Sequence, residues 1–175
     1  MNTALRVVAL AVASAWLRTT AAAQAKPSAG PVLRPSQGFE QLKPLLGEWD
    51  GQTASGTPSH VSYELVSGGT ALLERLKTGD EPEMVTVYTP DGDRLAVTHF
   101  CSAGNQPQMQ TEPINGDAKQ FSFAFVRVSN LANADAGHMH HLTVTIRDRD
   151  HFTQQWTWTE NGQAHTEVFR FTRQS

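Results

Sequence analysis

Alternation of apolar and polar residues with a period of two runs through most of the chain, and it constrains the fold more than any other feature. The alternation continues from residue 47 to residue 173 and is rich in Val, Thr, Phe and Trp. Successive side chains of a strand point to opposite faces of a sheet, so this pattern indicates strands with one buried face. The sequence therefore predicts an all-β protein.

Turn residues divide the alternating region into short segments. The dipeptides concerned favour the positive φ angles of tight hairpins, and they are Gly68-Gly69, Asp91-Gly92, Asn115-Gly116 and Asn161-Gly162. We expect about ten strands, preceded by a short helical turn from Phe39 to Leu46. The predicted strands lie near 47–54, 59–67, 70–78, 83–89, 93–101, 106–112, 119–128, 138–148, 151–160 and 164–173.

Closure of the sheet follows from the number of strands. Ten consecutive strands in an open sheet would leave two long unpaired edges, and closing the sheet into a barrel removes both. We therefore expect a single antiparallel up-and-down barrel, which at this size can hold a small ligand. The turn pattern also permits a two-sheet sandwich.

The N-terminal segment has the features of a secretory signal peptide. Arg6 precedes an apolar run that begins at Val7 and extends to Leu17, and small residues follow. The run is shorter than the roughly 20 residues that span a bilayer, and no cysteine for lipid attachment lies nearby. We expect a signal peptide over 1–23, a flexible leader over 24–38 and a barrel domain over 39–175. The protein is then exported, periplasmic or secreted, and soluble, without a membrane anchor.

Charge and cysteine content exclude some classes of function and of stabilisation. The chain has 14 basic and 17 acidic residues, and its formal net charge of −3 offers no footprint for nucleic acid. Cys101 is the only cysteine, so the chain has no internal disulfide. A lone thiol in an oxidising compartment must be buried or bound.

Gly47-Glu48-Trp49, directly after the predicted helical turn, is similar to the Gly-x-Trp opening of lipocalin-like (calycin) barrels. In those folds the tryptophan closes one end of the barrel and stacks near a basic residue of the last strand. The resemblance implies this role for Trp49, with Arg170 or Arg173 as its partner. Some lipocalin-like barrels also hold haem through a histidine near the C-terminus, which would be His165 here.

A second resemblance covers most of the chain after the leader. The segment from Thr98 to Pro107, the triplet His138-Met139-His140 and the segment from Phe152 to Trp158 resemble an uncharacterised family of exported bacterial proteins. The resemblance implies a lipocalin-like barrel, and the family has no activity that could be carried over.

Strand parity places several polar side chains inside the barrel. Each shares the apolar face of its strand, and they are His99 and Cys101, His138 and His140, and Gln154 beside Trp156 and Trp158. By the same rule Phe121, Phe123 and Phe125 face inward and His141 faces outward. Burying polar groups without partners costs free energy, so these groups need protein partners, water, a ligand or a metal.

We interpret this cluster as a binding pocket for a small, largely apolar molecule. Its polar groups are then His99, Cys101, His138, His140 and Gln154, and its walls are Trp156 and Trp158. In this interpretation the partner of the protein is a small-molecule ligand.

Other interpretations of the same residues stay open. His99, His138 and His140, with Cys101, could hold zinc or copper in a metal-dependent enzyme. Cys101 with His99 as its base could act in a thiol enzyme. The cluster could also consist of polar groups at a barrel mouth that are satisfied by backbone, Gln154 or water. The sequence does not decide whether the protein is an enzyme.

Overall fold

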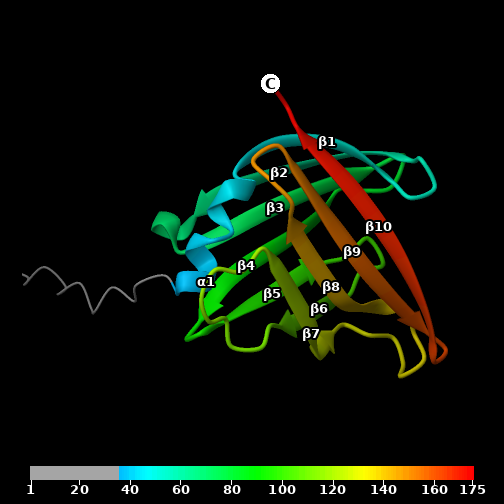
Figure 1. Ribbon diagram of the computed structural model, residues 1–175. Helices are drawn as coiled ribbons and strands as arrows, with labels where there is room; N and C mark the ends of the chain where they lie inside the picture. The colour runs from blue at the N-terminus through cyan, green and yellow to red at the C-terminus, as the bar shows by residue number, and fades with distance from the viewer. Residues whose placement is uncertain (1–35) are drawn as a thin grey trace, which may run out of the picture. The chain divides into compact units, whose positions relative to one another are not determined.

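Ten antiparallel strands form a closed barrel in the computed structural model, which describes residues 36–175 (Figure 1). Around the barrel the order is β1, β10, β9 and so on down to β2, so every strand pairs with its neighbours in sequence and the last pairs with the first. The strands are β1 Gly47–Thr53, β2 Pro58–Val66, β3 Ala71–Thr78, β4 Met84–Asp91, β5 Arg94–Phe100, β6 Gln106–Gln110, β7 Gln120–Ser129, β8 His138–Ile146, β9 His151–Glu160 and β10 Gln163–Arg173.

The predicted fold class is confirmed, and the sheet closes as a barrel. The predicted signal peptide over 1–23 lies outside the described residues, as does the predicted leader up to residue 35. The first described helix, α1 Gln37–Glu40, begins at the end of that leader. None of the described helices is long and apolar enough to cross a membrane.

The barrel closes where β1 pairs with β10, from Trp49 opposite Arg173 to Thr53 opposite Phe169. Gly51 lies in the middle of this pairing. A Cβ atom at Gly51 would lie 2.2 Å from the backbone oxygen of Arg170, so the two strands approach each other this closely only because residue 51 has no side chain.

Three of the four predicted hairpin turns occur where the sequence places them, whereas Asn115-Gly116 lies within the longer connection between β6 and β7. Asn161 and Gly162 connect β9 to β10 with φ angles of 49° and 72°. Positive φ at both central residues matches the right-handed twist of the two strands that they join. A short 3₁₀ helix, η2 Ser67–Gly69, contains the predicted Gly68-Gly69 turn between β2 and β3.

Two short helices close one end of the barrel. Ser36 caps α1, and the 3₁₀ helix η1 Lys43–Leu45 follows directly. The side chains of Phe39, Leu42 and Leu45 are buried in the core. Figure 1 shows α1 at the left end of the barrel, away from the β9–β10 hairpin. We call the end at α1 the closed end and the opposite end the open end.

Trp49 and Arg173 form the contact that the Gly-x-Trp resemblance implies. The guanidinium of Arg173 lies 4.0 Å from the centre of the Trp49 ring. Arg173 also donates hydrogen bonds to the carbonyl oxygens of Leu46 (2.7 Å) and Pro44 (2.5 Å). The other candidate, Arg170, is exposed on the outer face of β10. Arg173 therefore joins the last strand to both the first strand and the helical turn.

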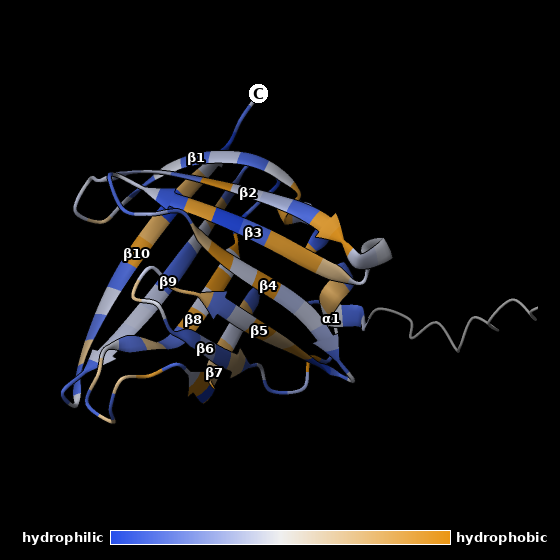
Figure 2. Cartoon of the chain, turned by 180° about the vertical axis from the view of Figure 1, so that it is seen from behind, coloured by the Kyte–Doolittle hydropathy of each residue, from blue (hydrophilic) through white to orange (hydrophobic). Residues whose placement is uncertain are grey.

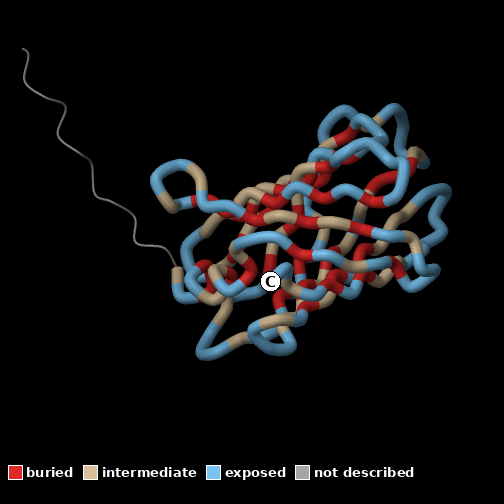
Figure 3. The backbone as a smooth tube through the Cα atoms, turned by 90° about the horizontal axis from the view of Figure 1, so that it is seen from above, coloured by how far each residue is buried: buried red, intermediate tan, exposed pale blue. Residues whose placement is uncertain are grey.

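Burial follows the period-two pattern along the strands. Figure 2 shows hydrophobic and hydrophilic positions alternating along β3. Figure 3 shows buried residues recurring along the strands and exposed residues in the loops. Toward the closed end the interior is aromatic, because Phe152 packs edge-on against Trp49 at 4.7 Å and stacks on Phe171 at 4.9 Å.

The two arginines of β10 provide a test of this closure. Arg173→Ala removes a cation–π contact and three hydrogen bonds from a charged donor, to the carbonyl oxygens of Leu46, Pro44 and Arg149, so we expect it to lower the free energy of unfolding by about 2 kcal/mol. Arg170→Ala, three residues away on the outer face, is the matched control and should change it by less than about 0.5 kcal/mol. Urea unfolding measures both values. Equal effects of the two substitutions would contradict the role assigned to Arg173.

Candidate functional site

A buried carboxylate lies near the centre of the barrel. Glu74 of β3 is fully buried, and it accepts hydrogen bonds from the Tyr88 hydroxyl (2.6 Å), the Gln154 amide (2.6 Å) and the Thr86 hydroxyl (3.3 Å). Gln154 also donates to the Tyr63 hydroxyl at 2.7 Å. These bonds satisfy a group whose burial is otherwise costly. We call Tyr63, Glu74, Thr86, Tyr88, His99 and Gln154 the buried polar network.

The bond between Glu74 and Gln154 crosses the barrel interior. Glu74 belongs to β3 and Gln154 to β9, and these strands are not neighbours in the sheet. The amide group of Gln154 is fully used, because its oxygen accepts a hydrogen bond from the Trp156 indole at 3.1 Å. The network thereby joins opposite walls of the barrel and fixes the indole ring that follows on β9.

Burial and hydrogen bonding shift the pKa of Glu74 in opposite directions. Burial raises the pKa of this carboxyl, and the hydrogen bonds from Tyr88, Tyr63, Gln154 and Thr86 lower it again in part. No cation partner offsets the burial among these contacts. The carboxylate is held by neutral donors alone, which makes the polar network sensitive to the loss of any one of them.

His99 extends the network toward the open end. Its Nδ1 lies 2.9 Å from the Thr86 hydroxyl oxygen, and its ring packs at 4.6 Å against Trp156. Thr86 donates to Glu74, so its oxygen accepts from Nδ1, and the other ring nitrogen, Nε2, has no hydrogen-bond partner among the described residues. Burial lowers the pKa of His99 to about 4, so the ring is neutral at pH 7.

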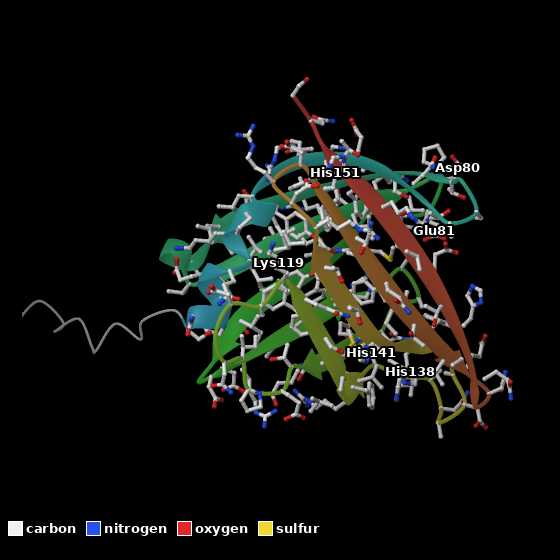
Figure 4. All side chains as sticks on the ribbon, viewed as in Figure 1. Asp80, Glu81, Lys119, His138, His141 and His151 are labelled. Atoms are coloured by element: carbon white, nitrogen blue, oxygen red, sulfur yellow. The ribbon has the colours of Figure 1, made fainter. Side chains whose placement is uncertain are left out.

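A pocket of about 740 Å³ occupies the open end of the barrel. Its apolar walls come from four strands, and they are Met84 of β4, Met139 of β8, Trp156 and Trp158 of β9 and Phe169 of β10. Polar residues from the β1–β2 and β3–β4 turns surround its mouth, where Asp80 and Glu81 lie away from α1 and Lys119 (Figure 4). This volume is within the range of small-molecule sites.

Two glycine-containing connections position Trp158 in the pocket wall. Asn105, in the turn after β5, donates a hydrogen bond to the Gly137 carbonyl oxygen at 2.9 Å. A Cβ atom at Gly137 would lie 2.0 Å from the Trp158 ring, so this ring packs directly on the backbone before β8. The wall is therefore formed by tertiary contacts that join the β5–β6 turn, β8 and β9.

The predicted site residues divide into two groups. Cys101, Trp156 and Trp158 line the pocket, and His165 lies at its exposed rim. His99 and Gln154 do not line it, but they contact Trp156 from within the barrel. They act on the pocket through the wall that they support.

The prediction that His140 faces the interior is wrong. His138 is buried, but His140 is exposed and stacks on Phe125 at 4.5 Å. The pairing of β8 with β9 shifts register between Met139 and His141, so a bulge at this point interrupts the alternation. Met139, opposite Trp158, lines the pocket instead. Phe125, predicted to face inward, is only half-buried.

The three predicted metal ligands do not come together. His138 and His140 lie near each other, with Nε2 and Nδ1 3.4 Å apart, whereas His99 contacts Thr86 and Trp156. Within residues 36–175 no group of three or more His, Cys, Asp or Glu side chains has a geometry that could hold a metal ion. The register shift in β8 explains why parity wrongly placed His140 inside the barrel with His99 and His138.

Cys101 is buried at the pocket wall as a free thiol. Burial raises the pKa of this thiol, so its neutral form is favoured. His99 and Cys101 share one face of the chain, but no hydrogen bond joins their side chains in the described part of the protein.

Several pocket residues are absent from the sequence-based prediction. Thr78, Phe169 and Glu167 line the pocket, and the parity of Phe169 and Glu167 on β10 was available as a signal. Glu74 also has the inward parity of Leu72 and Leu76 on β3. Gly137 left no local signal, because its role depends on a ring from another strand.

The comparisons with known proteins support the fold and leave the ligand open. No protein-family model and no curated protein matches the chain. Among solved structures, it is similar to a protein of unknown function from the DUF3598 family of Nostoc punctiforme, with a TM-score of 0.54 and 14% identity. The match covers 81% of this chain and 51% of the other, so the chain spans about half the length of that protein. The resemblance to exported bacterial proteins stays a prediction.

The environment of His99 predicts a specific dependence of stability on pH. An ordinary histidine titrates near 6.5, whereas His99 in the folded protein has a pKa of about 4. The unfolded chain therefore binds a proton first as the pH falls, and stability is lost between pH 6.5 and about 4, by roughly 3 kcal/mol in total. Urea unfolding across this range should show the loss.

Substitution isolates this contribution. His99→Gln should remove the part of the acid-dependent loss that comes from His99, while His165→Gln, at an exposed histidine, should retain it. Glu74 has a raised pKa and acts in the opposite direction, but it is present in both variants, so their difference reports His99. An unchanged pH dependence in His99→Gln would contradict this account.

Proposed function

We propose that the protein is exported and binds a small, largely apolar molecule in the pocket at the open end of the barrel. The observation that carries the proposal is the pocket itself, about 740 Å³ in volume and walled by two tryptophans, two methionines and a phenylalanine. Pockets of this size with apolar walls and few polar groups are typical of small-molecule sites.

The rigidity of the pocket wall supports the proposal. Trp156 is held by a hydrogen bond to Gln154 and by the His99 ring, and Trp158 packs on Gly137. Walls that are ordered before the ligand arrives lose little conformational entropy on binding, which favours affinity. The buried polar network is then the support of the binding site.

The enzyme alternatives have less support in the geometry. A thiol enzyme needs a thiolate with an adjacent base, but burial favours the neutral thiol of Cys101 and His99 is bonded to Thr86. The zinc or copper alternative needs His99 beside His138 and His140, and among the described residues these three histidines do not form a group that could hold a metal ion. Haem binding through His165 would place the histidine that coordinates the iron at the exposed rim of the pocket.

Calorimetric titration with decanol, a neutral apolar probe, tests the proposal. We expect saturable binding and a raised melting temperature, since a ligand that binds the folded state stabilises it. Trp158→Ala removes a large part of the wall and should weaken binding about tenfold or more. Phe100→Ala removes an exposed aromatic ring from the outer face of β5 and serves as the matched control.

Two results would contradict the binding of an apolar molecule in this pocket. Absence of binding by decanol, by longer and shorter alcohols and by the charged analogues decylammonium and decanoate would overturn it, as would equal weakening in Trp158→Ala and Phe100→Ala. An absorption spectrum with a Soret band in the purified protein would favour the haem alternative instead.

A further inference from the structure

The mouth of the pocket is acidic. Asp80 and Glu81 from the β3–β4 turn and Glu167 from β10 line it, and none of the described residues that line the pocket is a lysine or an arginine. Asp80 and Glu81 are exposed, and Glu167 is half-buried and accepts a hydrogen bond from the Ala54 amide at 2.9 Å. Three carboxylates therefore border an opening whose interior is largely apolar.

The basic side chains of β3 do not cancel this charge. Lys77 donates a hydrogen bond to the Glu81 backbone oxygen and points from the outer face of β3, where it fixes the turn. Arg75, also on the outer face, pairs with Glu64 and Glu83. The carboxylates that face the pocket thus keep a net negative charge at its mouth.

A second observation points to a polar group of a ligand inside the same pocket. Thr78, at the end of β3, is 6% exposed and lines the pocket. Its hydroxyl oxygen has no hydrogen-bond partner among the described residues. A buried polar atom without a partner requires an explanation, and a ligand N–H group that donates to this oxygen would satisfy it.

The tryptophan walls fit the same chemistry. Trp156 and Trp158 contribute indole rings to the wall of the same pocket, and indole is the aromatic group that attracts cations most strongly. A ligand carboxylate, in contrast, would meet three like charges at the entrance. The charge at the mouth and the character of the walls select the same kind of molecule.

We infer that the pocket is specific for an organic ammonium with an apolar body, such as an alkyl amine. The apolar body lies among Met84, Trp156 and Phe169, and the ammonium group lies at the mouth, near Thr78 and the three carboxylates. This inference rests on the proposed function and adds the charge of the ligand to it.

Three probes with the same chain length separate the proposed binding of an apolar molecule from the inferred preference for an ammonium group. Decylammonium, decanol and decanoate are titrated at neutral pH into the full chain by calorimetry, below the concentrations at which they form micelles. We expect decylammonium to bind at least about tenfold more tightly than decanoate, with decanol between them. Added salt should reduce this difference, because the carboxylates are largely exposed.

Two triple variants locate the effect. Asp80→Asn, Glu81→Gln and Glu167→Gln together should bring the affinities of decylammonium and decanoate to within about twofold of each other. Asp93→Asn, Glu112→Gln and Asp117→Asn change the net charge equally at exposed positions outside the pocket, and this control should keep the preference. Thr78→Val should weaken decylammonium binding more than decanol binding, because a charged donor makes the stronger hydrogen bond to the Thr78 hydroxyl oxygen.

The outcomes distinguish the inference from the proposed function. If none of the three probes binds, the proposed function fails and the inference fails with it. If decanol binds but decanoate binds as tightly as decylammonium, the pocket stands and its specificity for an ammonium is overturned. Equal loss of the preference in both triple variants would also overturn it, since the effect would then come from net charge alone.

Discussion

The hydrogen bond between Glu74 and Gln154 is the interaction on which the rest of the structure depends. It crosses the barrel from β3 to β9 and joins strands that do not pair. A carboxylate buried without a cation is tolerated only when its hydrogen bonds are complete, so Tyr88, Thr86 and Gln154 must stand in one arrangement. This requirement specifies how the two walls of the barrel are placed relative to each other.

The network also divides the interior into two parts with different roles. Along β9, Phe152 packs with Trp49 toward the closed end, Gln154 lies in the polar layer, and Trp156 and Trp158 line the pocket. Stability comes from the packed aromatic end, and the open end is left free to hold a ligand. One strand therefore contributes to the core, to the polar network and to the proposed binding site.

Much of the fold can be predicted from the sequence, because strand alternation and hairpin turns are local patterns. The pairing of Trp49 with the last strand also followed from a short motif, and Arg173 confirms it. The site was harder to predict. Parity fails at the bulge beside His140, and the support of Trp158 by Gly137 comes from tertiary contacts that leave no local pattern. The inward parity of Glu74 was visible, but its partners lie on other strands.

The indole N–H signals of the ¹⁵N-labelled full chain test the central claim most directly. Residues 36–175 contain three tryptophans, and of these Trp156 and Trp158 line the pocket whereas Trp49 does not. On titration with decylammonium, the account predicts that the signals of Trp156 and Trp158 shift together and saturate, while that of Trp49, at the closed end, stays in place. Unchanged signals from Trp156 and Trp158, or a shift of Trp49 alone, would contradict the account.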